Sequence, residues 1–149
     1  MPTYVVSTQV GRLDAAMKQE IASEITRIHS HTTGAQAFFV QVIFNEIAEG
    51  NQFVGGGLLR AEHIFVHGLI RTGRNSEQKN LLLTEMVESI VNTTSIARRH
   101  VWVYISDLAP EQMIEYGYVL PNPGLESDWL DSLLPDDRQY LLGQSSQGR

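Results

Sequence analysis

The sequence contains two copies of one unit. The copies are displaced by 61 residues, which is the separation between Lys18 and Lys79. At the same displacement, residues 40–46 (VQVIFNE) align with residues 101–107 (VWVYISD). Self-similarity at a fixed spacing indicates a duplicated supersecondary unit. We therefore expect the chain to fold as two equivalent halves.

Each copy begins and ends with a predicted strand. The opening strands are Thr3–Thr8 and Ile64–Ile70, and the closing strands are Phe38–Glu46 and His100–Leu108. β-branched and aromatic residues are frequent in all four segments, which is typical of buried strands. Together they predict a sheet of four strands.

A helix is predicted between the two strands of each copy. In the first copy, apolar residues recur at intervals of three or four, at Met17, Ile21, Ile25 and Ile28. This spacing gives one apolar stripe along a helix. The second copy repeats the pattern over residues 82–91, and Asn75 with Gln78 offers a capping box at its start.

Two β-α-β units predict an α+β fold with a four-stranded mixed sheet. A right-handed crossover makes the two strands of each unit parallel and places the helix on one face. We expect both helices on the same face of the sheet. The opposite face is also apolar, and the chain supplies no further layer to cover it, so association with other copies is predicted.

The chain is expected to form a single domain over residues 1–149. The first repeat covers about residues 2–46 and the second about residues 63–107, and a hydrophobic content of 42% is sufficient for one core. The linker, about residues 47–62, contains three successive glycines that predict a small hairpin.

The C-terminal segment, residues 108–149, has an irregular pattern. Prolines and a glycine at residues 121–124 predict a turn. Short helices are expected at Trp129–Leu133 and Asp136–Leu142, and the final residues 145–149 are predicted to be disordered.

Composition excludes several classes of function. A net charge of −6 argues against nucleic acid or an anionic membrane as partner, since both attract basic surfaces. The absence of cysteine excludes disulfides and cysteine-based zinc sites or nucleophiles. No basic start precedes an apolar run, and no apolar run is long enough to span a membrane, so a cytoplasmic location is predicted.

Arg71 and Arg74 lie between the third strand and the second helix. Two guanidinium groups beside a helix N-terminus can bind a carboxylate or a phosphate. The alternative is a pair of surface arginines in salt bridges. His29, near the end of the first helix, could simply complement the helix dipole.

His63 and His67 share one face of a strand. No third ligand has suitable spacing, so a core or interface role is favoured over a metal site. Tyr104, taken alone, suggests sheet packing, and Glu115 suggests a solvated surface charge.

Pro2 directly follows Met1. A small second residue usually permits removal of the methionine, which would leave Pro2 with a free secondary amine. An α-amino group titrates near about 8, so burial or nearby charge can tune it as an acid or base at neutral pH. The alternative is an inert chain start.

Together, these features resemble the tautomerase superfamily, and within it the cis-3-chloroacrylic acid dehalogenases. The resemblance extends from Pro2 to about Arg138 and rests on five stretches: residues 41–46 (QVIFNE), 64–69 (IFVHGL), 73–74 (GR), 100–104 (HVWVY) and 112–117 (QMIEYG). It implies a homotrimer whose subunits pack their sheets together.

The resemblance also implies an active site around the N-terminal proline. Its residue types are all present, as Pro2, His29, Arg71, Arg74, Tyr104 and Glu115. The implied substrate is a 3-haloacrylate, a small anionic carboxylate held by the two arginines and His29. Glu115 and Tyr104 would activate a water molecule, and protonated Pro2 would donate a proton. The implied reaction yields malonate semialdehyde and halide without a metal or organic cofactor.

Two alternatives use the same residues differently. A neutral Pro2 would act as a general base, and the chain would be a keto-enol tautomerase. Alternatively, the chain would be a non-catalytic trimeric scaffold similar to the cytokine-like branch of the superfamily.

The chain departs from the dehalogenase pattern at four positions. Ala35 and Ala37 replace polar residues, Phe39 replaces a leucine and Tyr118 replaces an arginine. These positions are expected to line or border the pocket.

Intact mass tests whether Pro2 can act. We expect purified protein to lack the mass of one methionine, because only then is the Pro2 nitrogen an amine. A mass that includes Met1 would leave this nitrogen an amide, unable to donate or accept the proton.

Overall fold

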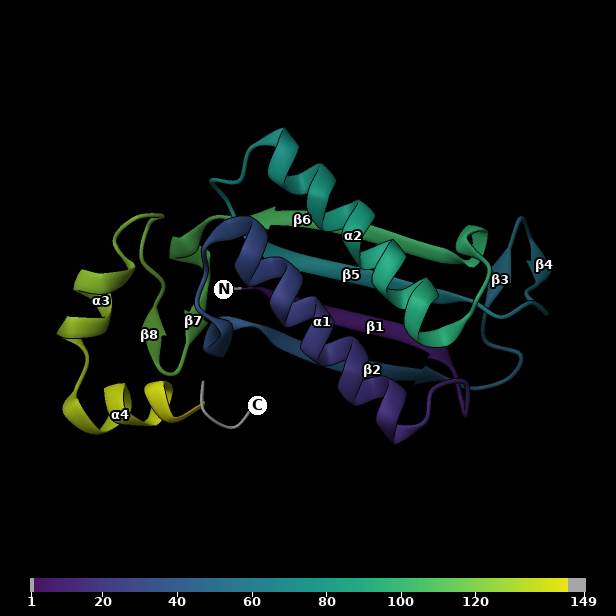
Figure 1. Cartoon of the computed structure of the whole chain (residues 1–149), viewed down its shortest axis with the longest axis horizontal. Coiled ribbons are helices and arrows are strands. Elements are labelled where there is room, and N and C mark those ends of the chain that lie inside the picture. The colour runs from purple at the N-terminus through teal and green to yellow at the C-terminus, as the bar shows by residue number, and fades with distance from the viewer. Residues whose placement is uncertain (1, 145–149) are drawn as a thin grey trace.

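A four-stranded mixed sheet forms the centre of the computed structural model, which describes residues 2–144 (Figure 1). Its strands, in the spatial order β2-β1-β5-β6, are β2 (Gln41–Ile47), β1 (Thr3–Gln9), β5 (Ile64–Arg71) and β6 (Val101–Leu108). β1 pairs parallel to β2 and β5 pairs parallel to β6, while β1 and β5 are antiparallel. The predicted pair of β-α-β units is therefore confirmed.

Helices α1 (Ala15–Thr33) and α2 (Ser76–Thr94) lie side by side on one face of the sheet (Figure 1). The Asp14 side chain caps α1 by accepting from the Met17 N–H at 2.8 Å. At the start of α2, Asn75 and Gln78 form the predicted capping box. Both helices are 19 residues long, as expected for duplicated units.

The main core lies between the two helices and the sheet. Both repeats contribute to it equally, because each supplies one helix stripe and alternate residues of its strands. Its fully buried side chains include Tyr4, Val6, Ile21, Ile25, Ile28, Ile64, Val66, Ile70, Leu82 and Met86. On the opposite sheet face, large side chains remain exposed: Ile43 by 43%, Trp102 by 41% and Tyr104 by 55%.

Smaller elements extend both ends of the sheet (Figure 1). The predicted hairpin is present at one end, as β3 (Phe53–Val54) and β4 (Gly57–Leu58). At the other end, where β1 begins, lie the hairpin β7 (Ile114–Glu115) with β8 (Tyr118–Val119) and the helices α3 (Glu126–Ser132) and α4 (Pro135–Gln144). Among the residues with described structure, no helix is long and apolar enough to cross a membrane.

The predicted closing strands are too long at their starts. Residues 37–39 and 98–100 form 3-10 turns, so the strands begin at Gln41 and Val101. Phe38 and Phe39 instead pack into a second apolar cluster against the C-terminal segment. The two turns are also 61 residues apart, so the duplication covers even this irregular feature.

The C-terminal helices differ slightly from the expected ranges. α3 begins at Glu126 and α4 at Pro135, both before the predicted starts at Trp129 and Asp136. The acidic first turns explain the earlier starts, because carboxylates stabilise helix N-termini. The predicted disorder of residues 145–149 lies outside the described residues.

Gly68 on β5 provides the space that Tyr4 occupies. A Cβ atom at Gly68 would lie 2.4 Å from Cε1 and 2.8 Å from Cδ1 of the Tyr4 ring. The close approach of ring and backbone therefore depends on glycine at this position.

We expect G68A to lower the free energy of unfolding by about 1–3 kcal/mol, because the added methyl group overpacks the core. The matched control is G143A in α4, where a Cβ meets nothing within 4 Å. Urea denaturation of both variants measures the effect. Equal stability of G68A and wild type would contradict the packing described for Tyr4.

Candidate active site

The candidate site lies at the end of the sheet where β1 begins and β5 and β6 end. The antiparallel register pairs Thr3 with Leu69, so Pro2 lies level with Ile70, the residue before Arg71. Pro2 is buried, and its carbonyl accepts a hydrogen bond from the Gln41 N–H at 3.0 Å. The topology thus brings the start of the chain beside the first of the two predicted arginines.

Arg71 is buried at the end of β5. Its Nη1 donates to the carbonyl oxygen of Pro121 at 2.6 Å, and its Nη2 forms an ion pair with Glu126. Its Nε is buried and has no hydrogen-bond partner among the described residues. The surface-arginine alternative is wrong for Arg71, because residues of the C-terminal segment contact and cover it.

Arg74 lines the same cavity as Arg71, which has a volume of about 380 Å³. Its Nε is likewise buried, again with no partner in the described part of the chain. Burial and the neighbouring Arg71 lower the pKa of Arg74 from its usual range. Two guanidinium groups thus meet at one cavity, and such groups can bind a carboxylate.

His29 lies inside the fold, four residues before the end of α1 at Thr33. Its Nδ1 is 2.8 Å from the Tyr4 Oη. Burial, followed by Arg74, lowers the pKa of His29 to about 3, and burial raises that of Tyr4. His29 is therefore neutral, so the prediction that it complements the helix dipole is wrong. If Nδ1 accepts from the protonated Tyr4 hydroxyl, Nε2–H remains available as a donor.

The start of α2 borders the cavity, and its capping box occupies the backbone N–H groups of Asn75 and Gln78. The Asn75 side chain accepts from the Gln78 N–H at 2.8 Å, and the Gln78 side chain donates to Thr32 at 3.1 Å. These bonds tie the start of α2 to the end of α1. The cationic donors of the site are the guanidinium groups of Arg71 and Arg74.

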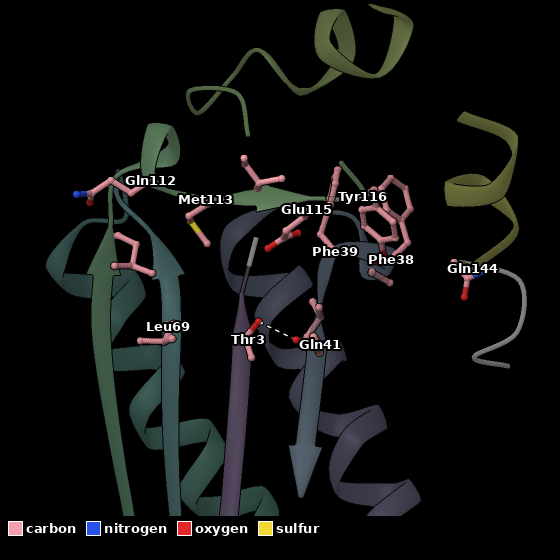
Figure 2. A pocket seen from close by; sticks show the side chains of 14 residues that line it. Thr3, Phe38, Phe39, Gln41, Leu69, Gln112, Met113, Glu115, Tyr116 and Gln144 are labelled. Carbon is pink, nitrogen blue, oxygen red and sulfur yellow. Dashed lines mark hydrogen bonds between the residues drawn. The ribbon is translucent and has the colours of Figure 1, made fainter. Parts of the chain in front are cut away.

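Glu115 lies in an adjacent cavity of about 730 Å³ (Figure 2). It sits on β7 and points toward the sheet end near Thr3 and Gln41 (Figure 2). The next residue, Tyr116, has a φ of 55°, an uncommon value for a non-glycine residue, and Gly117 has a φ of 86°. The Tyr116 hydroxyl donates to the Phe38 carbonyl at 2.9 Å, which anchors the turn that carries Glu115.

Three of the four departures from the dehalogenase pattern line these cavities. Ala35 lines the arginine cavity, Ala37 lines the Glu115 cavity, and Phe39 lines both. Tyr118 lines neither; its hydroxyl donates to Asp137 at 2.6 Å. It therefore links β8 to α4, and the expectation that it borders the pocket is not met.

Within one chain, the fold does not bring Tyr104 to the two arginines. It pairs in register with His67, whereas Arg71 pairs with Leu108, four residues or about 13 Å further along β6. It packs edge-on against Phe65 and lines a separate cavity of about 290 Å³ on the exposed sheet face. The placement agrees with sheet packing, but the Tyr104 side chain is exposed rather than satisfied in a core.

Only His67 lies on a strand, because β5 begins one residue after His63; both histidines have polar partners. His63 is 3.2 Å from the Gln52 side chain, and His67 is 2.9 Å from the Ser106 hydroxyl. Within residues 2–144, no group of three or more potential ligands could hold a metal ion.

Sequence reasoning missed Tyr4 and Glu126. A hydroxyl in an otherwise apolar buried strand was a signal for Tyr4, because buried tyrosines need a hydrogen-bond partner. Glu126 gave no such signal, since it lies 55 residues from Arg71 in the chain.

Comparisons with known proteins agree with this fold. Residues 1–132 match the family model Tautomerase_3, described as "Putative oxalocrotonate tautomerase enzyme". The chain is 32% identical to N1, a member of the cis-3-chloroacrylic acid dehalogenase family, with a TM-score of 0.89; the match covers 95% of this chain and 99% of N1. The comparison with curated proteins finds no match.

Two further solved structures are similar. Native Ps01740 is 29% identical with a TM-score of 0.72, over 76% of this chain and 99% of that one. The wild type asymmetric trimer of fused 4-OT is 21% identical with a TM-score of 0.72, over 78% and 94%. At 21% identity, the likeness to fused 4-OT supports the fold alone.

His29 should remain neutral in the folded protein well below its usual titration range. In the unfolded chain the His29 ring binds a proton near pH 6.5, whereas in the folded chain it does so only near pH 3. The free energy of unfolding therefore falls as the pH drops between these values. Between pH 7 and pH 5 we expect a loss of about 2 kcal/mol from this group. NMR titration of the His29 ring and unfolding of H29Q, which should lack this part of the slope, measure it. A His29 midpoint near 6.5 would contradict the buried Tyr4–His29 pair.

Proposed function

The chain belongs to the tautomerase superfamily, and from this premise we propose that it adds water to the double bond of 3-substituted acrylates. With a cis-3-haloacrylate, the products would be malonate semialdehyde and halide. The observation that carries the proposal is the pair of buried Nε–H groups of Arg71 and Arg74 without partners in the described chain.

The carboxylate of the substrate would bind between these two donors. Charge-assisted hydrogen bonds to guanidinium groups are among the strongest that a carboxylate can form. The Nε2–H of neutral His29 would add a further donor from the side of Tyr4. Binding draws electron density from the double bond and leaves C3 electrophilic.

Glu115 would then accept a proton from a water molecule whose oxygen attacks C3. The electron pair of the double bond takes a proton at C2 from protonated Pro2. The product is a 3-halo-3-hydroxypropanoate. Its C3–halogen bond breaks as the hydroxyl loses its proton, which gives the aldehyde, a halide ion and a proton.

Pro2 requires a free amine for this step. Its position, buried and level with Ile70 beside Arg71, supports a role as proton donor. In protein that lacks Met1, the positive charges of Arg71 and Arg74 would disfavour a protonated Pro2 amine, and the negative charge of Glu115 would favour it. A protonated Pro2 serves hydration, because the amine must deliver a proton.

The active unit would be a homotrimer. The exposed face with Ile43, Trp102 and Tyr104 supports association between copies. Because Tyr104 lies about 13 Å along the sheet from the register position of Arg71, a neighbouring copy would supply the tyrosine that assists Glu115.

A second candidate function is keto-enol tautomerisation, which the description of the matching family model favours. A neutral Pro2 would then act as general base and move a proton within an enol acid. The two functions differ in their need for Glu115, because only hydration requires a base for water.

Hydration predicts release of halide from cis-3-chloroacrylate by protein that lacks Met1. We expect P2A, R71A and E115Q to lose at least about 100-fold in kcat/KM, since each removes a group used in the transition state. The control is E111Q, which changes an exposed glutamate near Glu115 and should keep wild-type activity. Ion chromatography of halide gives the rates.

The same variants separate the two functions. Ketonisation of phenylenolpyruvate that depends on Pro2 but only weakly on Glu115, without halide release at high enzyme concentration, would contradict hydration and favour the tautomerase. Loss of ketonisation to the same extent in P2A and E115Q would count against the tautomerase.

A further inference from the structure

The arginine cavity contains a carboxylate of its own, Glu126 at the start of α3. One oxygen pairs with Nη2 of Arg71, and the other accepts from the Gly124 N–H at 2.8 Å. The side chain of Arg71 is only 2% exposed, whereas that of Glu126 is 31% exposed. Both oxygens of Glu126 are therefore engaged, and the carboxylate is fixed against the buried guanidinium.

The segment that carries Glu126 holds Arg71 at two points. Nη1 of Arg71 donates to the Pro121 carbonyl at 2.6 Å, five residues before Glu126. Between these contacts, Pro123 packs against Gly73, where a Cβ atom would lie 2.7 Å from the proline ring. The segment thus occupies both terminal nitrogens of Arg71 and leaves its Nε–H as the buried donor without a described partner.

Glu126 also sets the charge of the cavity. Burial acts to raise the pKa of Glu126, but the hydrogen bond and charge of Arg71 and backbone hydrogen bonds together outweigh it, so the pKa lies below its usual range. His29 is neutral at neutral pH, and Asp107, which faces Arg74, is paired with Lys79. Two arginines and one glutamate leave the cavity with one net positive charge, and the protonated Pro2 and the Glu115 carboxylate of the proposed function offset each other.

We propose that Glu126 is a positioning residue that orients Arg71 and restricts the site to ligands with a single carboxylate. The inference rests on the proposed binding of a carboxylate at Arg71 and Arg74. One ligand carboxylate neutralises the cavity. A second carboxylate would enter a partly buried site that has no further net positive charge to compensate it, which is unfavourable.

Binding of two unreactive acids of equal chain length tests this inference. We would titrate protein that lacks Met1 with propanoate and with malonate by calorimetry at pH 7. Wild type should prefer propanoate. E126Q removes one negative charge and so raises the net charge of the cavity by one. It should shift the ratio of the two dissociation constants toward malonate by about tenfold or more, because charge pairs are strong in a partly desolvated site.

Two further variants separate charge from fold. D128N makes the same charge change at an exposed position of the same helix and should keep the wild-type ratio. E126D keeps the charge but shortens the side chain, so it should weaken binding of both acids and preserve the preference. Thermal melting of each variant identifies any loss of fold.

The outcomes distinguish this inference from the proposed function. If wild type binds propanoate and R71A does not, but E126Q keeps the wild-type ratio, the role of Glu126 is overturned and the carboxylate site stands. If wild type binds neither acid, the carboxylate site is overturned, and the role of Glu126 with it.

Discussion

Two like charges, one buried and one half-buried, lie together at the end of the sheet and are the constraint on which the rest of this site depends. Arg71 and Arg74 repel each other and lose solvation, which is unfavourable without compensation. The chain supplies only part of that compensation, through Glu126 and the Pro121 carbonyl. The remaining positive charge and two Nε–H groups without partners in the described chain create the demand for an anionic ligand.

The duplication gives the sheet two equivalent ends, but their residues differ. The antiparallel pairing of β1 with β5 places the start of each repeat beside the end of the other repeat's first strand. At the equivalent end, His63 stands where the first copy has Pro2, and Val10 and Leu13 stand 61 residues before Arg71 and Arg74. The fold offers two related positions. The first has the proline and two arginines, whereas the equivalent end has Arg12, which pairs with Glu62.

Local patterns allowed most of the fold to be predicted. The helix stripes, the capping box of Asn75 and Gln78, and the hairpin at residues 55–57 depend on neighbouring residues. Phe38 and Phe39 could not be placed, because they pack against a C-terminal cluster far away in sequence. Glu126 and the burial of His29 were missed for the same reason. Tyr104 lies on the correct strand, yet one chain does not bring it to the arginines.

A crystal structure of protein that lacks Met1, with bound propanoate, tests carboxylate binding at the two arginines most directly. We expect carboxylate oxygens within hydrogen-bond distance of the guanidinium groups of both Arg71 and Arg74, with the Arg71–Glu126 pair intact. Propanoate bound elsewhere, with both Nε–H groups still lacking a partner, would contradict this account.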